Sequence, residues 1–309
     1  MSAVQILEEL RPLAFAVAYR MLGSVSEAED IVQEALLRLH LALDQGERIE
    51  SPRAYVSTVV TRLCIDHMRS ARVRRESYVG EWLPEPLVDD GRSDPAEHAE
   101  MADSLSLAFL VLLESLTPEQ RAAFVLREVF DYPYEQIAAI IRTGEDNARQ
   151  LVSRARKHVD EGRPRFEASQ AQREQLARSF LAAFSNGDLH ALEELLAHDV
   201  VLHGDGGGRV RAIARPVHGR TKVARMLLAG WRAAEPSGGW SLSQVHVNGQ
   251  PGAMVRDPAG KLLGVVVLDI ADGHIQALRS IVNPDKLRHL DAAPGLGPRP
   301  ATKPPRTGR

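Results

Sequence analysis

Hydrogen-bonding and cationic side chains recur at helical spacing between Asn147 and Lys157. One face of a helix over this stretch would carry Asn147, Gln150, Ser153, Arg154 and Lys157, with Arg149 and Arg156 beside them. Such groups can hydrogen-bond to base edges and pair with phosphates, and a helix that presents them fits the major groove of DNA. The opposite face repeats small and aliphatic residues that predict a buried stripe: Ala148, Leu151, Val152, Ala155 and Val159.

A shorter helical pattern precedes this face and must position it. On one side it carries Ile137, Ala138, Ile140 and Ile141. The segment Arg142-Thr143-Gly144 supplies a tight turn, so the two patterns together are typical of a helix-turn-helix. Gly144 has no capping side chain, and we expect the carboxylate of Asp146 near the start of the second helix instead. A basic face is often only a solvated face, so this pattern alone leaves DNA contact open.

Composition limits the class of protein. A chain of 309 residues is long enough for two or three domains, and its net charge of −3 requires any nucleic-acid surface to be local. The single cysteine, Cys64, stands among aliphatic residues, which predicts a buried thiol and excludes a disulfide within the chain. Residues 1–25 lack the order of a signal peptide, and no apolar run reaches the ~20 residues that span a bilayer. We therefore expect a cytoplasmic protein with no membrane partner.

Residues 1–79 contain patterns for successive helices. The first runs from Ile6 to Leu22, with Pro12 as a point where it could kink or break. The second starts at a capping box, Ser26-Glu27-Ala28-Glu29, and its outer face is either a solvated acidic face or a partner surface. The third starts at Ser51-Pro52 and ends in arginines that suit a phosphate backbone: Arg69, Arg72, Arg74 and Arg75.

Two segments carry a specific resemblance. AEDIVQEALLRLH (28–40) followed by SPRAYVSTVVTRLCIDHMRSARVRR (51–75) resembles region 2 of extracytoplasmic-function sigma factors, in the sigma-70 family. LTPEQRAAFVLREVFDYPYEQIA with the helix-turn-helix is similar to their region 4. The resemblance implies that Asp30, Gln33 and Glu34 dock on the clamp helices of core RNA polymerase. It also implies that residues 44–69 melt and hold the −10 element of promoter DNA, while residues 147–157 read the −35 element.

The resemblance assigns basic and polar residues to each promoter element. Contacts with −10 DNA are expected from Arg62, Arg69, Arg72, Arg74 and Arg75, and contacts with −35 DNA from Asn147, Arg149, Gln150, Ser153, Arg154 and Lys157. Opening a promoter requires bases to leave the stack, so a protein that captures unpaired bases favours the open state. Residues 42–50 are the expected capture loop, and they contain no aromatic residue.

Residues 80–103 have the composition of an interdomain linker, because proline, glycine and acidic residues are frequent from Gly80 to Asp94. This linker nevertheless contains Trp82, Leu83, Pro84, Glu85 and Pro86 in succession. An exposed Trp-Leu pair favours docking on a surface, and the alternative is a local turn cluster.

The periodicity changes in residues 170–290. Two helical patterns come first, and a further helix is expected over Thr221–Ala234. Strands are predicted at Val200–His203, Arg209–Ala214, Ser241–Val247, Ala253–Arg256, Leu262–Ile270 and Ile275–Val282. This order indicates an α+β cone and resembles the SnoaL-like domains of the nuclear-transport-factor-two superfamily. His203 and Asp205 could form an acid-base pair there, but without a third orienting group we predict no enzyme activity, cofactor or metal site.

Three short stretches resemble the marks of a sigma-factor subfamily with a fused SnoaL-like extension and no separate anti-sigma factor. They are the linker segment 82–86, the turn Asp205, Gly206, Gly207, Gly208 and Arg209, and the segment Asn283, Pro284, Asp285, Lys286 and Leu287. In that subfamily the extension is implied to regulate the sigma core. Glycines permit close approach of another chain, and Asn283-Pro284-Asp285 can aim Lys286 and Leu287 at neighbours. Each stretch could also be simply a turn.

The sequence thus predicts a multidomain protein with two all-α sigma domains followed by an α+β cone. The expected parts are region 2 at 1–79, a linker at 80–103, region 4 at 104–163, the SnoaL-like domain at 170–290 and a disordered tail at 291–309. Expected partners are core RNA polymerase, promoter DNA and a possible small-molecule ligand in the cone. The alternative is a SnoaL-like small-molecule-binding protein or enzyme fused to a repressor module, which would not need the segment from Ala28 to Arg75.

Overall fold

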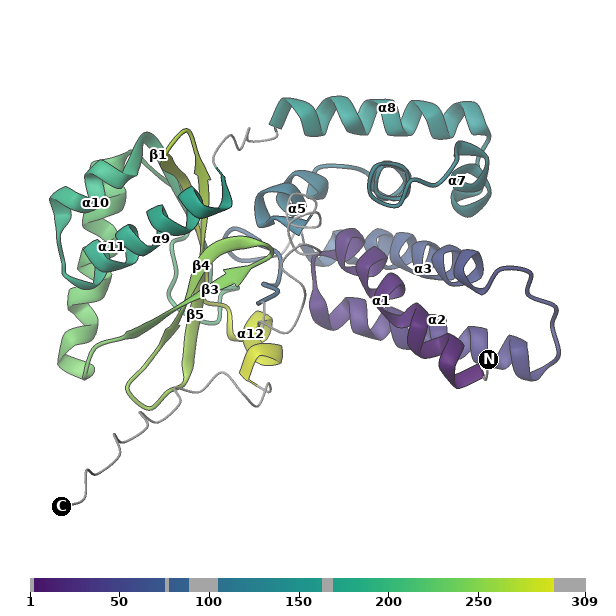
Figure 1. Cartoon of the computed structure of the whole chain (residues 1–309), viewed down its shortest axis with the longest axis horizontal. Helices are drawn as coiled ribbons and strands as arrows, with labels where there is room; N and C mark the ends of the chain where they lie inside the picture. Colours follow the sequence, from purple (N-terminus) through teal and green to yellow (C-terminus); the bar gives the residue numbers. More distant parts are fainter. Residues whose placement is uncertain (1–2, 76–77, 89–104, 163–168, 292–309) are drawn as a thin grey trace, which may run out of the picture.

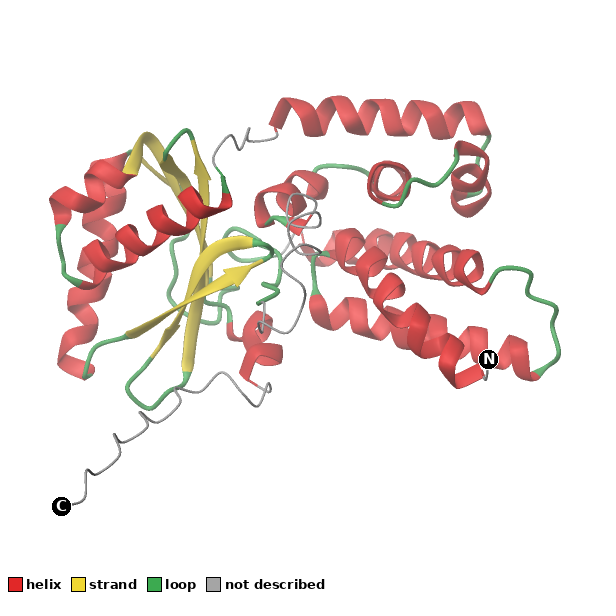
Figure 2. Ribbon diagram, in the orientation of Figure 1, coloured by secondary structure: helices red, strands yellow, loops and turns green. Residues whose placement is uncertain are grey.

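The computed structural model describes residues 3–75, 78–88, 105–162 and 169–291. An all-helical half and an α+β half lie side by side, as Figure 2 shows by secondary structure. Helices α1 to α8 form the first half, and α12 lies between the sheet of the second half and these helices (Figure 1).

The first helical unit consists of α1 (Ala3–Leu22), α2 (Val25–Asp44) and α3 (Pro52–Arg75). Pro12 lies inside α1, and the helix runs through it without a break. The apolar stripes predicted from the sequence meet in a common core, where Leu22, Val32 and Val60 are fully buried. Cys64 is buried in the same core, as predicted, and burial raises the pKa of its thiol.

The predicted start of α2 is wrong by two residues. Ser24, and not Ser26, is the residue before the helix, and its Oγ accepts a hydrogen bond from the amide of Glu27. The predicted box fails because the carboxylate of Glu85 accepts hydrogen bonds from the amides of Val25 (2.7 Å) and Ser26 (3.1 Å). Free amides at a helix start need acceptors, and here a distant residue supplies them.

The second helical unit contains α5 (Leu107–Glu114), α6 (Pro118–Phe124), the π-helical turn η1 (Val125–Val129), α7 (Tyr134–Ile141) and α8 (Glu145–Gly162). The predicted cap at Thr117 is confirmed as a capping box with Gln120. The helix-turn-helix is confirmed as well, since α7 and α8 pack on a core that includes Ile137 and Val152. The turn depends on Arg142, whose φ of 58° is left-handed.

The α+β half begins with α9 (Gln170–Ser185) and α10 (Leu189–Leu195), and α11 (Arg220–Ala234) with the short η2 (Glu235–Ser237) follows later. Its described residues form a six-stranded sheet in the order β2-β1-β6-β5-β4-β3. The strands are β1 (Leu196–Asp205), β2 (Val217–His218), β3 (Ser241–Val247), β4 (Gln250–Arg256), β5 (Leu262–Ala271) and β6 (His274–Ile281). Only the β1–β6 pair is parallel among these pairings, so the predicted, mostly antiparallel cone is confirmed. Helix α12 (Pro284–Asp291) follows β6 directly.

The strand predicted at Arg209–Ala214 is wrong, because these residues form a turn and an irregular segment. Gly207 and Gly208 take left-handed φ values of 58° and 69°, and the amide of Arg209 donates to the carbonyl of Gly206 at 2.9 Å. A strand cannot accommodate these dihedral angles, so the chain leaves the sheet here.

Candidate nucleic-acid interface and interdomain cluster

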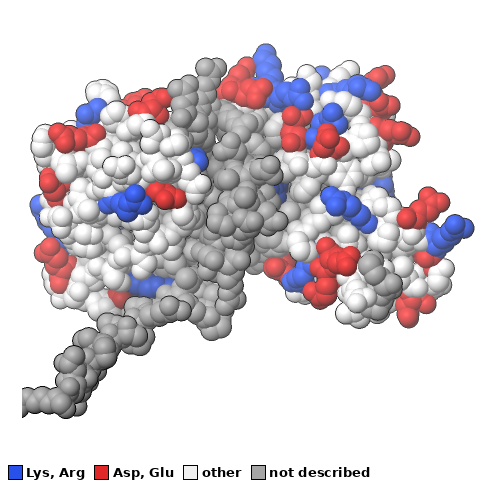
Figure 3. All heavy atoms as spheres, in the orientation of Figure 1, with Lys and Arg blue, Asp and Glu red and all other residues white. Residues whose placement is uncertain are grey.

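The outer face of α8 is exposed at every position that the sequence assigned to −35 DNA: Asn147, Arg149, Gln150, Ser153, Arg154 and Lys157. Several of these side chains have partners on the same helix or beside it. Asn147 donates to Oγ1 of Thr143 at 2.7 Å, and the guanidinium of Arg149 lies 4.5 Å from the ring centroid of Tyr134. Basic and acidic side chains are interspersed over the helical half on the face shown in Figure 3. Among the described residues on this face, no broad patch of one charge sign covers the helical half.

The arginines assigned to −10 DNA have different surroundings. Arg62 donates from Nε to the carbonyl of Ile140 at 2.9 Å and from Nη2 to the carbonyl of Ala139 at 3.0 Å. These carbonyls belong to the last turn of α7, where free carbonyl groups and the helix dipole favour a cation. Arg69 pairs with Glu119 of α6 at 2.6 Å. Arg72, Arg74 and Arg75 belong to the end of α3, and their side chains lie outside the described residues.

Two further contacts join the helical units. The hydroxyl of Tyr132 donates to Oγ of Ser57 at 2.7 Å. Arg121 is fully buried, donates from Nε to the carbonyl of Arg20 at 2.9 Å and pairs with Glu114. Burial lowers the pKa of Arg121 to about 9, so its guanidinium remains charged at neutral pH. The α1–α3 unit and the α5–α8 unit are thus held together by buried polar contacts, an arrangement we call the closed arrangement.

The face of α2 assigned to core RNA polymerase combines acidic and apolar groups. Asp30 and Gln33 are exposed, and Glu34 pairs with Arg38 at 2.7 Å. Leu37 is 52% exposed and Leu41 is 47% exposed on the same helix, seven and eleven positions after Asp30. Neither leucine is among the residues that the sequence assigned to core RNA polymerase. Their helical spacing relative to Asp30 was the available signal.

The linker segment is buried instead of solvated. Leu83 is fully buried, and Pro84, Glu85 and Pro86 are buried beside it. The amide of Glu85 donates to the carbonyl of Gly23 at 2.8 Å, and the hydroxyl of Tyr19 donates to the carbonyl of Glu85 at 2.7 Å. The Glu85 carboxylate also accepts from Oγ of Ser24 at 2.9 Å. One side of the linker is therefore fixed to the junction of α1 and α2.

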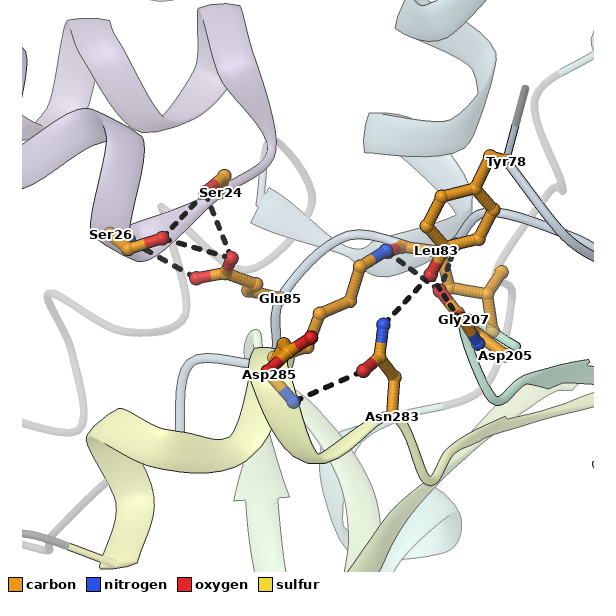
Figure 4. Close-up of polar contacts among 10 residues, drawn as sticks. Ser24, Ser26, Tyr78, Leu83, Glu85, Asp205, Gly207, Asn283 and Asp285 are labelled. Carbon is orange, nitrogen blue, oxygen red and sulfur yellow. Dashed lines mark hydrogen bonds and ion pairs between the residues drawn. The ribbon is translucent and has the colours of Figure 1, made fainter. Parts of the chain in front are cut away.

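The other side of the linker contacts the α+β half at a group of five residues that we call the interdomain cluster: Tyr78, Leu83, Asp205, Asn283 and Lys286. Figure 4 labels all of these residues except Lys286. The fully buried carboxylate of Asp205 accepts hydrogen bonds from the Tyr78 hydroxyl (2.5 Å), the Leu83 amide (2.8 Å) and Lys286 Nζ (2.7 Å). Lys286 also donates to the carbonyl of Leu83. A buried carboxylate needs such compensation, because desolvation disfavours an unpaired charge.

Asn283 and Gly207 complete the geometry around Tyr78. Nδ2 of Asn283 donates to the Tyr78 hydroxyl at 2.9 Å, and Oδ1 accepts from the amide of Asp285 at 3.0 Å. A Cβ on Gly207 would lie 2.1 Å from Nδ2 of Asn283, so this position requires glycine. Burial and the hydrogen bond to Asp205 raise the pKa of Tyr78, so its hydroxyl keeps the proton that it donates.

Other residues from the three marked stretches support the same contact. The ammonium of Lys286 lies 4.2 Å from the ring centroid of Trp82, and Leu287 is buried. Asp285 pairs with Arg209 at 3.0 Å, and His289 Nε2 donates to the carbonyl of Pro86 at 2.8 Å. Pro284 begins α12, while Gly206 and Gly208 pack against Ala212 and Val79 respectively.

His203 and Asp205 do not form a pair with each other. His203 Nδ1 lies 2.7 Å from the carboxylate of Glu81, and Asp205 is occupied by the interdomain cluster. Each side chain therefore contacts a residue between Tyr78 and Leu83, and the two do not form an acid-base pair.

Asn248 is a buried connecting residue that was not predicted from the sequence. Its Nδ2 donates to the Tyr19 hydroxyl at 2.8 Å and to the carbonyl of Leu105 at 2.9 Å, and its Oδ1 accepts from the Leu87 amide at 2.9 Å. One side chain thus joins the first helical unit, the linker and the start of the second unit. The only local signal, Asn-Gly between two strands, indicates a hairpin turn and nothing more.

A cavity of about 800 Å³ lies inside the cone, lined mainly by apolar side chains from α9, α11 and the sheet. Within the described ranges, no group of three or more His, Cys, Asp or Glu residues is placed to hold a metal ion. No helix in those ranges is both long and apolar enough to cross a membrane.

Comparison with known proteins agrees with this layout. The family models for Sigma-70 region 2, Sigma-70 region 4 and a SnoaL-like domain match residues 6–74, 106–159 and 177–278. The chain is 39% identical over 293 residues to the ECF RNA polymerase sigma factor SigJ of Mycobacterium tuberculosis, covering 92% of each. It belongs to the ECF RNA polymerase sigma factors. A probable ECF RNA polymerase sigma factor, SigI of the same organism, is 36% identical over 91% of this chain and 93% of the relative.

The crystal structure of Mycobacterium tuberculosis SigJ is similar to the structure of this chain, with a TM-score of 0.74 and 36% sequence identity. The match covers 92% of this chain and 98% of the SigJ chain. The match extends through all three domains, so the predicted fold class is confirmed. A sigma factor binds core RNA polymerase and directs it to promoters, and it is not an enzyme. The alternative of a fused repressor module is not supported, because a Sigma-70 region 2 domain at residues 6–74 precedes the region 4 domain at residues 106–159.

Proposed function

We propose that this sigma factor docks on core RNA polymerase through the outer face of α2. Asp30, Gln33 and Glu34 supply polar and acidic groups there, and Leu37 and Leu41 supply apolar area. Exposed large apolar side chains beside charged ones are typical of a protein interface, where a few buried anchors contribute most of the binding energy. Support comes from exposure: Asp30 and Gln33 are exposed, and so are both leucines, whereas Glu34 is partly covered by its pair with Arg38.

For promoter DNA, we assign the α8 face to the −35 element and the arginines of α3 to the −10 element. The exposure of the six α8 residues supports the first assignment. The assignment of Arg62 to −10 DNA requires a structural change, because its guanidinium donates hydrogen bonds to the carbonyls of Ala139 and Ile140 in this structure. The closed arrangement therefore competes with −10 DNA for the same side chain, and promoter binding requires regions 2 and 4 to separate.

The SnoaL-like domain, in this proposal, restrains that separation. It contacts the linker through the interdomain cluster, and Asn248 connects the linker to both sigma regions. Contacts made only in one arrangement shift the equilibrium toward it. We infer that the domain is inhibitory in this form and acts within the chain, without a separate anti-sigma factor. Since the template is chromosomal DNA, we place this activity in the cytoplasm.

Run-off transcription with purified core polymerase tests the restraint. Lys286→Met removes the ammonium that joins Asp205 to the linker but keeps most of the apolar stem, and Lys222→Met on the exposed side of α11 is the matched control. The proposal expects a higher run-off yield from Lys286→Met at limiting promoter concentration and an unchanged yield from Lys222→Met. An equal or lower yield from Lys286→Met would reject inhibition by the SnoaL-like domain.

A further inference from the structure

The cavity of the SnoaL-like domain has the size of a ligand site. Its volume is about 800 Å³, and its walls come from α9, α11 and the concave side of the sheet. Protein interiors contain few voids larger than a water molecule, whereas small-molecule pockets usually enclose about 300–1,000 Å³. A cavity of this size is therefore a candidate ligand pocket and not a packing defect.

The walls of the cavity indicate an apolar occupant. Among the described residues that line it, side-chain nitrogen or oxygen atoms occur only on Arg211, Arg215, Trp240 and Ser280. Phe180 and Phe184 stack with ring centroids 6.2 Å apart on α9. Such aromatic walls favour flat or chain-like apolar groups, because ring faces and edges both make close contacts.

Charge at the rim indicates the other end of the occupant. Arg211 and Arg215 are exposed in the irregular segment that follows the turn at residues 205–209. Met226 and Ala229 of α11 also line the cavity and are exposed. Among the described residues that line the cavity, each charged side chain is thus an arginine. Arginine binds carboxylate, sulfonate or phosphate groups through paired hydrogen bonds. We propose that the cavity binds an amphipathic organic anion, with its apolar body inside and its acidic group at Arg211 and Arg215.

The cavity shares its walls with the interdomain cluster. Gly204 and Val282 line the cavity, and the next residues in the chain are Asp205 and Asn283 of the cluster. The rim segment also packs tightly on this strand end: a Cβ on Gly204 would lie 2.8 Å from Cβ of Ile213. Packed elements of this kind transmit small shifts, so an occupant that moves the rim also moves Asp205.

Resting on the inhibitory role proposed above, this coupling makes the anion the inducing signal. Occupancy weakens the interdomain cluster, which releases the linker and allows regions 2 and 4 to separate. Coupling between two sites is reciprocal in binding free energy. A variant with a weakened cluster therefore binds the anion more tightly, even when no polymerase or DNA is present.

Two fluorescent probes with the same apolar body test the site on the full-length protein. 1-Anilinonaphthalene-8-sulfonate carries an anionic group, and N-phenyl-1-naphthylamine lacks it. We expect saturable binding of the sulfonate, weakened about tenfold in the double variant Arg211→Ala/Arg215→Ala, with less than about a twofold change for the neutral probe. Arg225→Ala/Arg232→Ala is the control, because these exposed arginines of α11 do not line the cavity.

A plug at the rim locates the bound probe. Ala229→Trp places a large side chain at an exposed lining position, so the fold is retained and both probes lose binding. Unchanged sulfonate affinity in Ala229→Trp would overturn the site. Equal loss of both probes in the double arginine variant would overturn the anionic end.

The coupling has its own measurement. Lys286→Met should bind the sulfonate at least about threefold more tightly than the wild-type protein, and Lys222→Met should not. Equal affinities would overturn the coupling. If Lys286→Met changes run-off yield but neither probe binds, the site fails and the inhibitory role stands. If the sulfonate binds through the arginines but Lys286→Met leaves run-off yield unchanged, the site stands and the inhibitory role fails.

Discussion

The side-chain nitrogen of Asn248 lies 2.8 Å from the hydroxyl oxygen of Tyr19, which is 229 positions earlier in the chain. The same amide group contacts Leu87 and Leu105, so its hydrogen-bonding capacity is used on three separate segments. Asn248 is only 3% exposed, so each partner would lack a substitute from solvent if the amide were removed. This residue therefore joins the three domains as a physical unit.

Asn248→Gly removes the amide but keeps the backbone, because glycine adopts the φ of 53° without strain. We expect the free energy of unfolding to fall by about 2–3 kcal/mol, since buried hydrogen-bonding partners are left unsatisfied. Chemical denaturation measures this change. Asn186→Gly, at the exposed end of α9, is the comparison and is expected to have a small effect. A loss below about 0.5 kcal/mol at Asn248 would contradict the joining role.

Gly207→Ala tests the close approach between the glycine turn and Asn283. The new methyl group would force Nδ2 of Asn283 away and break its hydrogen bond to Tyr78. Gly273→Ala is the matched control, because its φ of 69° imposes the same backbone strain while no atom lies within 4 Å of the new Cβ. We expect Gly207→Ala to be less stable than Gly273→Ala by about 1–3 kcal/mol in thermal or chemical unfolding. Equal stabilities would show that the contact contributes nothing.

Arg154→Ala tests the α8 face. If the guanidinium reads a base of the −35 element, affinity for duplex carrying this element should fall by about 1–3 kcal/mol, which is roughly a 5- to 150-fold change. Fluorescence anisotropy at several salt concentrations measures affinity and salt dependence together. Arg178→Ala, at an exposed position of α9, should leave both the affinity and the salt dependence unchanged. Wild-type affinity and salt dependence in Arg154→Ala would remove this residue from the interface.

Leu37→Ser and Asp30→Lys test the α2 face. Both positions are exposed, so the fold should be retained while association with core RNA polymerase weakens. A lost interface anchor typically costs about 1–2 kcal/mol or more, which is roughly tenfold in Kd. Competition binding against the unaltered protein gives the change, with Glu9→Lys on α1 as the charge-reversal control. If both variants compete for core RNA polymerase as well as the wild-type protein does, the docking surface lies elsewhere.

Local signals explain which elements were predictable. Thr117 followed by Pro118 fixes a helix start within a few residues, and the structure has the predicted capping box there. The start of α2 was misplaced because its acceptor, Glu85, is 60 positions from Val25. Alternating residues after Arg209 imitate a strand, but the left-handed glycines before them turn the chain out of the sheet.

The candidate site also has parts that local sequence patterns predict and parts that depend on distant residues. Exposure of the α8 face follows from helical periodicity, so the six positions could be placed from the sequence. The use of Arg62 depends on how two units pack, and no local pattern states which carbonyls it meets. Asn248 has a local turn signal that fully accounts for its residue type, which conceals its second role.

The position of Glu85 has a consequence for any signal that acts on the linker. Its carboxylate satisfies the first amides of α2, the helix whose outer face we assign to polymerase docking. Pulling the linker away from α2 would leave the amides of Val25 and Ser26 without this acceptor, so the first turn of the helix would lose part of its capping. In the regulation that we propose, an occupant therefore separates Asp205 from Leu83 while Glu85 keeps its contacts with the start of α2.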